Sequence, residues 1–334
     1  MSHKNIALFV AHIGCPNMCS FCNQHIISGK QETATAADVH DAVRTALNSG
    51  CRDGQLAFFG GSFTAIERSY MTELLAAAKE HVDAGEISGI RISTRPDAID
   101  KEVLILLKEY GVEAIELGAQ SMDDEVLKLN RRGHTSEDIK EASRLIKSFG
   151  FELGLQMMTG LYGDTDEGAI KTAEEIIKLE PETVRIYPTV VLFGTELHNL
   201  YNQGVYRPQT LDEAVTLCAE LLKMFEEAQI KVIRLGLHSG GNVEEGYIAG
   251  AYHPAFRELV EGRIYYEKAL KELSRFEGGL SHTYKIRVNP KEISKMRGQK
   301  RQNIVKLKDN NYICNVISDE SLKKYELEIE EDKA

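Results

Sequence analysis

The sequence lacks any apolar run near the roughly 18 uninterrupted residues that a membrane-spanning helix requires. Its N-terminus, MSHKNIALFVAHIG, also lacks the basic start and small-residue cleavage site of a signal peptide. From these absences we expect a cytoplasmic chain with no membrane segment. A length of 334 residues with 43% hydrophobic residues allows one large α/β barrel domain with an extension, or two ordinary domains.

Cysteine is scarce and unevenly placed. Six cysteines are too few to stabilise a fold of this size by disulfides, and three of them fall within residues 15–22. Cys51, Cys218 and Cys314 stand alone. This distribution predicts a metal site in a reducing compartment.

Positive charge is in deficit overall. The net charge of −11 argues against a protein that coats nucleic acid by bulk electrostatics. One segment departs from this balance and carries Lys285, Arg287, Lys291, Lys295, Arg297, Lys300, Arg301, Lys306 and Lys308. We find no solenoid repeat and no low-complexity segment.

Short β-rich runs alternate with amphipathic helices through the first two thirds of the chain. The predicted strands are residues 5–10, 55–59, 90–94, 112–117, 151–157, 183–187 and 231–235. Helices are predicted after Thr35, over 69–84, from Asp100 to before Gly111, from Ser136 to before Gly150, from Thr165, and over 210–228.

This alternation is typical of a parallel sheet and predicts an α/β fold, a partial (β/α)6 TIM-like barrel. A doubly wound open sheet would show the same alternation. Beyond about Gly240 the pattern fades. We therefore expect a barrel over residues 1–240 and a C-terminal extension over 241–334, whose basic segment is a candidate substrate contact.

Cys15, Cys19 and Cys22 follow the first predicted strand. Their spacing would also suit one stripe of a buried helix, but Gly14, Pro16 and Asn17 disfavour a helix here. Thiolates on a loop can converge on iron. Structural zinc normally takes four ligands, so the alternative zinc site needs His12, His25 or an external ligand as the fourth. Three ligands to a four-iron cluster leave one iron open for chemistry.

The Cys-x3-Cys-x2-Cys spacing, with Phe21 before the last cysteine, resembles the signature of the radical S-adenosylmethionine (SAM) superfamily. The resemblance implies that Cys15, Cys19 and Cys22 hold one [4Fe–4S] cluster, with a partial barrel of the radical SAM type around it. In that family the open iron chelates SAM, and an electron cleaves it to a 5′-deoxyadenosyl radical that abstracts hydrogen from the substrate. The electron implies a reductant partner such as flavodoxin or ferredoxin.

Gly60, Gly61, Ser62, Phe63 and Thr64 follow the second predicted strand. Paired glycines let the backbone approach a ligand closely, although such a pair is also common in plain turns. The resemblance implies that this segment holds the methionine amino group of SAM.

Further motifs resemble the radical SAM domain of the Elongator catalytic subunit, a tRNA-modifying family also described as histone acetyltransferase-like. They are Thr94-Arg95-Pro96-Asp97, Glu116-Leu117-Gly118-Ala119-Gln120-Ser121, Arg131-Arg132-Gly133-His134-Thr135, Met157-Met158, Gly160-Leu161-Tyr162-Gly163, Ile186-Tyr187-Pro188-Thr189 and Gly194-Thr195. The resemblance runs over about residues 6–236.

By position, this resemblance implies that Arg95, Gln120 and Ser121 line the cavity for SAM and substrate, and that Gly160 and Leu161 contact adenosine. Each residue also has a plainer interpretation. Arg95 could pair with Asp97, and Gln120 could cap a strand. Tyr187 could be a core residue, and His134 and His238 could be structural hydrogen-bonding groups.

Three departures from the Elongator pattern stand out. Ser93 occupies the place where that family usually has Glu, at a position that contacts the ribose of SAM. Arg185 stands where the family usually has Lys. The sequence also ends without the acetyltransferase domain, so the family's full reaction does not transfer.

Three functions follow as hypotheses. The first is a radical SAM enzyme acting on a nucleoside of RNA, with tRNA as partner and the basic segment as phosphate contact; a solvated charged face is the alternative for that segment. The second keeps the radical chemistry and assigns a small metabolite or a protein side chain. The third is a non-enzymatic iron–sulfur or zinc module.

Overall fold

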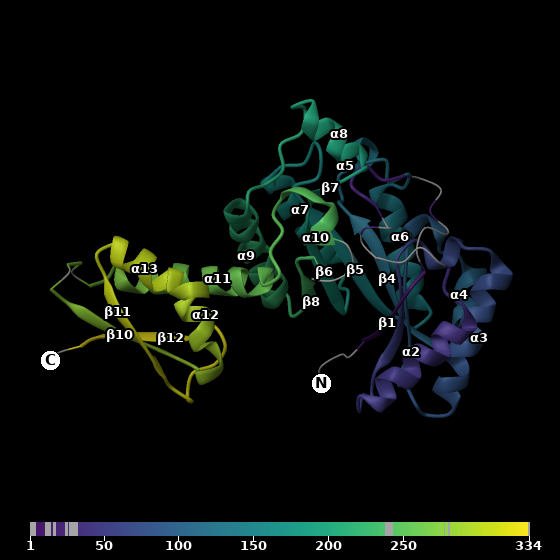
Figure 1. Cartoon of the computed structure of the whole chain (residues 1–334), viewed down its shortest axis with the longest axis horizontal. Helices are drawn as coiled ribbons and strands as arrows, with labels where there is room; N and C mark the ends of the chain where they lie inside the picture. The colour runs from purple at the N-terminus through teal and green to yellow at the C-terminus, as the bar shows by residue number, and fades with distance from the viewer. Residues whose placement is uncertain are drawn as a thin grey trace. The chain divides into compact units, whose positions relative to one another are not determined.

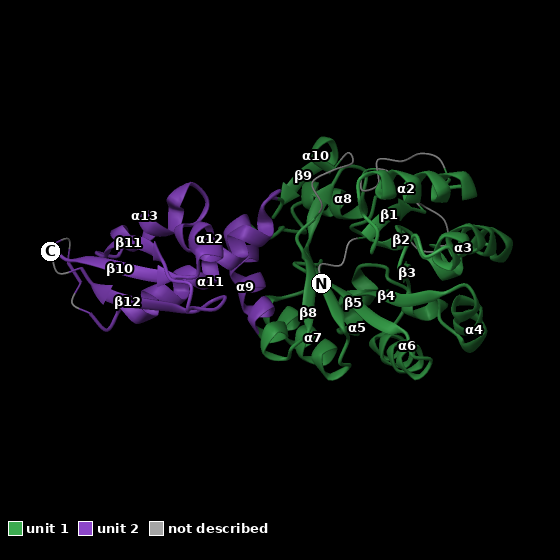
Figure 2. Ribbon diagram, turned by 90° about the horizontal axis from the view of Figure 1, so that it is seen from below, with its two compact units in different colours: residues 1–210, 224–252 green, residues 211–223, 253–334 purple. Residues whose placement is uncertain are grey.

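The fold was analysed in a computed structural model that describes residues 5–10, 15, 18–23, 26, 33–237, 243–276, 278–279 and 281–332. The chain divides into two compact units (Figure 1, Figure 2). Unit 1 comprises residues 1–210 and 224–252, and unit 2 comprises residues 211–223 and 253–334.

Unit 1 is built on a parallel sheet of seven strands, in the order β1-β2-β3-β4-β5-β6-β8. The strands are β1 (Asn5–Phe9), β2 (Gln55–Phe59), β3 (Gly89–Thr94), β4 (Val112–Gln120), β5 (Glu152–Thr159), β6 (Thr183–Pro188) and β8 (Lys231–Leu235). The sheet curls into a half-barrel, which confirms the predicted TIM-like partial barrel. Sequential order with parallel pairing excludes the doubly wound alternative, whose strand order reverses at a switch point.

Helices lie along the outside of this sheet (Figure 2). They are α2 (Ala36–Asn48), α3 (Arg68–Asp83), α4 (Lys101–Glu109), α6 (Ser136–Ser148) and α7 (Asp166–Lys178). Short elements stand between them: η1 (Phe63–Ala65), η2 (Pro96–Ala98) and α5 (Asp124–Leu129). Thr35 with Asp38, and Thr135 with Asp138, form capping boxes that fix where α2 and α6 begin.

The chain between β6 and β8 adds structure that alternation does not predict. After β7 (Val190–Leu192) come α8 (Glu196–Asn202) and α9 (Leu211–Glu227), and after β8 come α10 (Val243–Gly246) and β9 (Tyr247–Gly250). β7 and β9 pair antiparallel beside the main sheet. Residues 211–223 of α9 belong to unit 2, although the helix was predicted as one more barrel element.

Unit 2 is a separate α/β arrangement with its own core. It contains α11 (Phe256–Leu273), β10 (Thr283–Val288), η3 (Pro290–Glu292), α12 (Ile293–Arg297), η4 (Gln299–Arg301), α13 (Gln302–Asp309), β11 (Ile313–Ser318) and β12 (Leu327–Glu331). β10 is central, parallel to β11 and antiparallel to β12. Tyr265, Tyr284, Ile286, Met296 and Leu307 are buried between the helices and this sheet.

Within the described part of the chain, no helix is both long enough and apolar enough to cross a membrane.

Candidate active site at the strand ends of the half-barrel

The cysteine segment follows β1 and therefore starts at the edge of the sheet where parallel strands end. Cys19 is buried, Cys22 is half-buried and Cys15 is exposed. The Cys22 N–H donates to the Cys19 carbonyl at 3.2 Å, which closes a tight turn between these two residues. All six cysteines are free thiols.

Ser20 attaches this segment to the rest of unit 1. Its hydroxyl donates to Asn130 Oδ1 at 2.6 Å, and its N–H donates to the Asn130 carbonyl at 3.1 Å. The Ser20 carbonyl accepts from the Leu197 N–H at 2.7 Å. Both Ser20 and Asn130 are buried, so these bonds are shielded from competing water. The segment is thereby held between the end of α5 and the start of α8.

Arg132 joins the cysteine segment to β4. One of its guanidinium nitrogens lies 3.1 Å from Cys19 Sγ and another donates to the Gly118 carbonyl at 2.6 Å. The guanidinium also lies 6.0 Å from the ring centre of Phe21. Arg132 belongs to the motif Arg131–Thr135, but its sequence position alone does not predict this contact. The sequence signal that could have identified Arg132 is the pair of arginines that follows a strand end and a short helix.

The end of β3 faces the same cysteines. Although the residue as a whole is exposed, partial burial of the Cys15 thiol raises its pKa; Cys19 adds to that rise, and Arg95 and Arg132 oppose it. Arg95 is almost fully buried and forms a bidentate ion pair with Asp97, with both N–O distances at 2.8 Å. The pairing that was expected as the plainer role of Arg95 is therefore present. Its charge still acts on Cys15 and Cys19.

Gly60 and Gly61 form the part of the β2 loop that remains partly accessible. Their φ angles of 81° and 58° lie in the left-handed region, where glycine carries little strain. A partly accessible backbone at a strand end is suited to hold a charged ligand group.

The side chains of the next three residues, Ser62, Phe63 and Thr64, make contacts within the protein. The hydroxyls of Ser62 and Thr64 lie 2.9 and 2.6 Å from Thr94 Oγ1, which ties the β2 loop to β3. The Phe63 ring stacks on Phe58 with 4.6 Å between ring centres. The expectation that Ser62, Phe63 and Thr64 bind SAM stays a prediction, because their side chains support the loop in this structure.

Gln120 ends β4 with φ at 69°, an uncommon backbone conformation for a residue other than glycine. It is buried, and its Oε1 accepts from Gln156 Nε2 at 3.3 Å. Ser121 is also buried, but its hydroxyl accepts from the Asp123 N–H and lies 3.4 Å from Thr172 Oγ1. Gln120 therefore lies buried at the end of β4, while the Ser121 hydroxyl stabilises the loop before α5.

Gly160 and Leu161 follow β5. The Gly160 carbonyl accepts from the Tyr206 hydroxyl at 2.6 Å, and the φ of Gly160 is 67°. Leu161 packs with Val126 and Met158, and Tyr187 contacts this small cluster together with Phe21. The core role considered for Tyr187 is therefore observed, and Phe21 connects the cysteine segment to β5 and β6.

A buried charged network links β3, β4 and β6 below these strand ends. Glu116 accepts from Arg185 at 2.6 and 2.9 Å and from Arg91 at 3.3 Å. Arg91 also donates to Glu152 at 2.8 Å and to Gln55 at 3.1 Å. Burial disfavours the Arg185 charge, but Glu116 outweighs that effect and raises the pKa of Arg185. Arg185, the departure from lysine, thus has a bidentate partner. Ser93 is the neighbour of Glu116 in the β3–β4 register.

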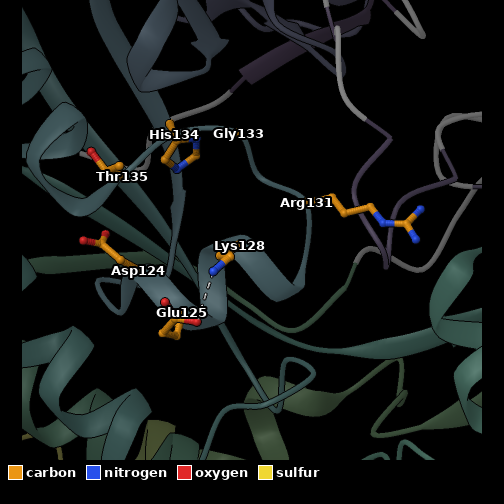
Figure 3. Close-up of a pocket in the computed structure, with 7 residues that line it drawn as sticks. All are labelled: Asp124, Glu125, Lys128, Arg131, Gly133, His134 and Thr135. Carbon is orange, nitrogen blue, oxygen red and sulfur yellow. Dashed lines mark ion pairs between the residues drawn. The ribbon is translucent and has the colours of Figure 1, made fainter.

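A pocket opens between α5 and the start of α6 (Figure 3), lined by Asp124, Glu125, Lys128, Arg131, Gly133, His134 and Thr135. His134 is buried there, with Nε2 3.4 Å from the Ala119 carbonyl. Burial lowers its pKa to about 4, and the Arg132 charge adds to this effect. His134 is therefore neutral near pH 7 and makes the structural contact considered for it.

Arg131 points away from His134 and pairs with Glu196 (Figure 3). His238 lies outside the described residues.

No three His, Cys, Asp or Glu side chains within the described ranges come close enough to share a single metal ion. His12 and His25, considered as fourth zinc ligands, lie outside these ranges. A four-iron cluster binds each thiolate at a different iron, so its ligands stand further apart than those of one ion. Three thiols on one short segment, two of them beside arginine charges, fit the donor set of such a cluster.

The chain belongs to the radical SAM superfamily, and it is an enzyme of that superfamily. The superfamily model matches residues 10–176, and the model of the radical SAM C-terminal domain matches residues 181–266. The matched regions contain the cysteine segment and the ends of the six main-sheet strands that follow it.

The chain is also similar in sequence to tRNA uridine(34) acetyltransferases and to Elongator proteins. The chain is 30% identical over 183 residues to a tRNA uridine(34) acetyltransferase of Methanocaldococcus jannaschii, covering 49% of this chain and 34% of that protein. It is 33% identical over 139 residues to human Elongator complex protein 3, covering 41% of this chain and 25% of that protein. The chain therefore spans about a third or less of the length of these relatives.

A solved structure shows the same fold. Elp3 of the archaeon Methanocaldococcus infernus superposes with a TM-score of 0.62 at 21% identity, covering 80% of this chain and 68% of that one.

Proposed function

We propose that this enzyme modifies a nucleoside of tRNA by radical SAM chemistry. Cys15, Cys19 and Cys22 would hold one [4Fe–4S] cluster at the open edge of the half-barrel, and SAM would bind beside it. When bound, cluster and SAM supply a 5′-deoxyadenosyl radical, which requires one electron from a partner such as flavodoxin or ferredoxin. The cysteine distribution supports a reducing, cytoplasmic setting for this reaction.

One observation carries the proposal: the cysteine segment is fixed directly over the strand ends. Ser20 holds it to Asn130, and Arg132 holds Cys19 to the backbone of β4. Positioning of this kind is the main contribution of a protein whose cofactor performs the difficult chemistry.

The remaining residues have supporting roles in this proposal. The Gly60–Gly61 backbone can approach the methionine part of SAM. Ser93, Gly160 and Leu161 would lie toward the ribose and adenosine of SAM, and Gln120 would line the cavity for SAM and substrate. The Glu116 network fills the interior below, which excludes water from that side of the cavity. Support for a tRNA substrate comes from the similarity to the tRNA uridine(34) acetyltransferase of Methanocaldococcus jannaschii.

The radical chemistry is tested by anaerobic reconstitution with iron and sulfide. We expect 5′-deoxyadenosine on addition of SAM and dithionite, and none from Cys19→Ser. Cys51→Ser is the matched control and should keep the product, because Cys51 is a lone cysteine distant in sequence from the site. Purified protein that holds only zinc, or that forms no 5′-deoxyadenosine under several reductants, would refute the proposal.

The substrate is tested separately by nucleoside mass spectrometry of total tRNA. A strain lacking the gene should lose a modified nucleoside that the parent contains, and the parental gene should restore it while a Cys19→Ser gene should not. An unchanged nucleoside profile combined with an altered metabolite profile would support the small-metabolite hypothesis instead.

A further inference from the structure

Unit 2 places its basic segment in a β-α-α-β unit. β10 leads through α12 and α13 to β11, and β10 and β11 are parallel neighbours. The two helices are joined by residues 298–301, with the sequence Gly298-Gln299-Lys300-Arg301, which we call the cationic loop. The core of unit 2 lies under the helices, where Met296 and Leu307 are fully buried, so the loop is supported from below.

Four of the nine cations in the basic segment are paired with carboxylates, and a fifth is hydrogen-bonded to the backbone. Lys285 pairs with Asp332, Arg287 with Glu330, Lys295 with Glu261 and Glu292, and Lys306 with Asp212. Arg297 donates to the Val316 carbonyl. These contacts account for five of the nine side chains and assign them to the fold.

The other four cations are exposed and, within the described part of unit 2, have no carboxylate in ion-pair range. They are Lys291, Lys300, Arg301 and Lys308. Two of them are adjacent in the cationic loop. The charged face that the sequence suggested therefore contains two groups of cations. One group is paired and stabilises unit 2, and the other consists of these four cations, two of which lie in the cationic loop.

The loop has a defined backbone conformation. Gly298 has φ at 71°, and a Cβ there would lie 2.9 Å from Asn303 Cγ, so no larger residue fits without movement. Lys300 and Arg301 have φ angles of 50° and 62°, which non-glycine residues seldom adopt. The buried Asn303 amide donates to the carbonyls of Gly262, Lys295 and Met296 and fixes the loop against α11 and α12.

The exposed face of α13 continues this surface. Val305 and Lys308 are three residues apart, so they share one face of α13, which begins directly after Arg301. Val305 is 55% exposed, so an apolar side chain lies beside Lys308 on this face. A polyanion that also carries flat apolar groups would complement this face better than a simple anion would.

We propose that the cationic loop and this face of α13 bind the backbone of single-stranded RNA. The inference rests on the proposed function, since it supplies the tRNA contact that the half-barrel needs. KH domains hold the backbone of about four nucleotides with a Gly-x-x-Gly loop between two helices. The cationic loop has the first glycine of such a loop, and Arg301 takes the left-handed conformation at the position of the second.

The test uses the full chain and a fluorescent single-stranded 12-nucleotide RNA in an anisotropy titration across a salt series. Lys300→Gln with Arg301→Gln should weaken binding at least tenfold at low salt. Each single-strand phosphate contact contributes about 0.7 to the slope of log affinity against log salt, so losing two should lower the slope by about 1.4. Lys308→Gln alone should weaken binding about threefold, and it changes only a regular helical position.

The matched control is Lys271→Gln with Lys323→Gln, which removes two exposed cations of the same unit. Lys271 lies nine residues beyond Gly262 on α11, about 13 Å along the helix axis from the loop's contact with it. The control should bind RNA as the parent does. An equal loss in the control, absence of RNA binding by the parent, or binding of polyglutamate as strong as that of RNA would each overturn the inference.

The two proposals fail separately. Cleavage of SAM without RNA should proceed equally in the parent and in Lys300→Gln/Arg301→Gln, because the loop has no part in it. A parent that forms 5′-deoxyadenosine but binds no RNA would refute the RNA surface alone. A parent that binds RNA through the loop but forms no 5′-deoxyadenosine would refute the radical chemistry alone.

Discussion

Arg131 and Arg132 are adjacent in the chain, yet only Arg132 contacts a cysteine. Replacing Arg132 by Met removes a charge-assisted hydrogen bond, worth about 2 kcal/mol, to the Cys19 sulfur. Hydrogen bonds to the sulfurs are one of the factors that set the potential of an iron–sulfur cluster. We expect Arg132→Met to retain less iron per chain after reconstitution and to have a more negative reduction potential.

Arg131→Met provides the control for this prediction. It removes the same charge one residue away, where the side chain is 58% exposed and pairs with Glu196. Its iron content and potential should match those of the parent. Equal losses in both variants would mean that overall charge, not the bond to Cys19, governs the cluster.

At Asp164, burial raises the pKa to about 6, with nearby Asp123 and Asp166 adding to the rise against a bond from the Thr165 N–H. The folded state therefore binds a proton more tightly than the unfolded chain, so stability falls as pH rises from about 4 to above 6. Asp164→Asn keeps an acceptor for Thr165 and removes this penalty. We expect it to stabilise the protein by at most about 3 kcal/mol at pH 8 and by little at pH 4.5, measured by urea unfolding. Equal effects at both pH values would contradict this.

At the scale of the elements, the buried network of Glu116 predicts how much the contacts between strands contribute to the stability of the half-barrel. Glu116→Gln leaves Arg91 and Arg185 with a weaker shared partner inside the sheet. Removing one member of a buried ion pair typically costs about 3–5 kcal/mol. We expect a loss of this size in urea unfolding, whereas Glu109→Gln, on the exposed side of α4, should change stability by less than about 0.5 kcal/mol. Similar small effects in both would show that the network is not needed for stability.

The elements of the half-barrel could be predicted because each one is specified locally. All seven strands are short and contain several apolar residues. The predicted helix starts at Thr35, Asp100 and Thr165 are N-caps whose side chains bond to the first turn. Gly111 and Gly150 follow the ends of α4 and α6 with positive φ, as predicted for helix stops. Local signals of this kind need no knowledge of the remaining chain.

The contacts of the site were less predictable because they join distant segments. Arg132 meets Cys19 across 113 residues, and Ser20 meets Asn130 across 110. The pairing of β7 with β9 likewise joins segments separated by α8, α9 and β8. Sequence reasoning placed Gln120 and the cysteines near strand ends, but it had no means of identifying which side chains hold the cysteine segment in place.

At the scale of the whole molecule, the two units predict that the half-barrel unit extends to residue 252, beyond the boundary predicted near residue 240. A chain ending at residue 240 would lose β9, whose antiparallel partner is β7, and the buried Val243 that packs with Val190 and Leu192. It would also lose α11, to which α9 is tied by the Arg263–Asp212 and Lys223–Glu267 pairs. A chain ending at residue 252 keeps the contacts of β9 and Val243, but it loses the contacts between α9 and α11.

We therefore expect urea midpoints in the order full chain, then residues 1–252, then residues 1–240. Each fully buried apolar side chain that becomes exposed costs about 1.5–3 kcal/mol, so both truncations should be clearly resolved from the full chain. Light scattering should show association of both shortened chains, because residues 211–223 of α9 would expose Leu217, Leu221 and Leu222, which are buried in the full chain. If residues 1–240 unfold at the midpoint of the full chain and stay monomeric, the boundary near residue 240 is correct, and α9 belongs with the half-barrel throughout its length.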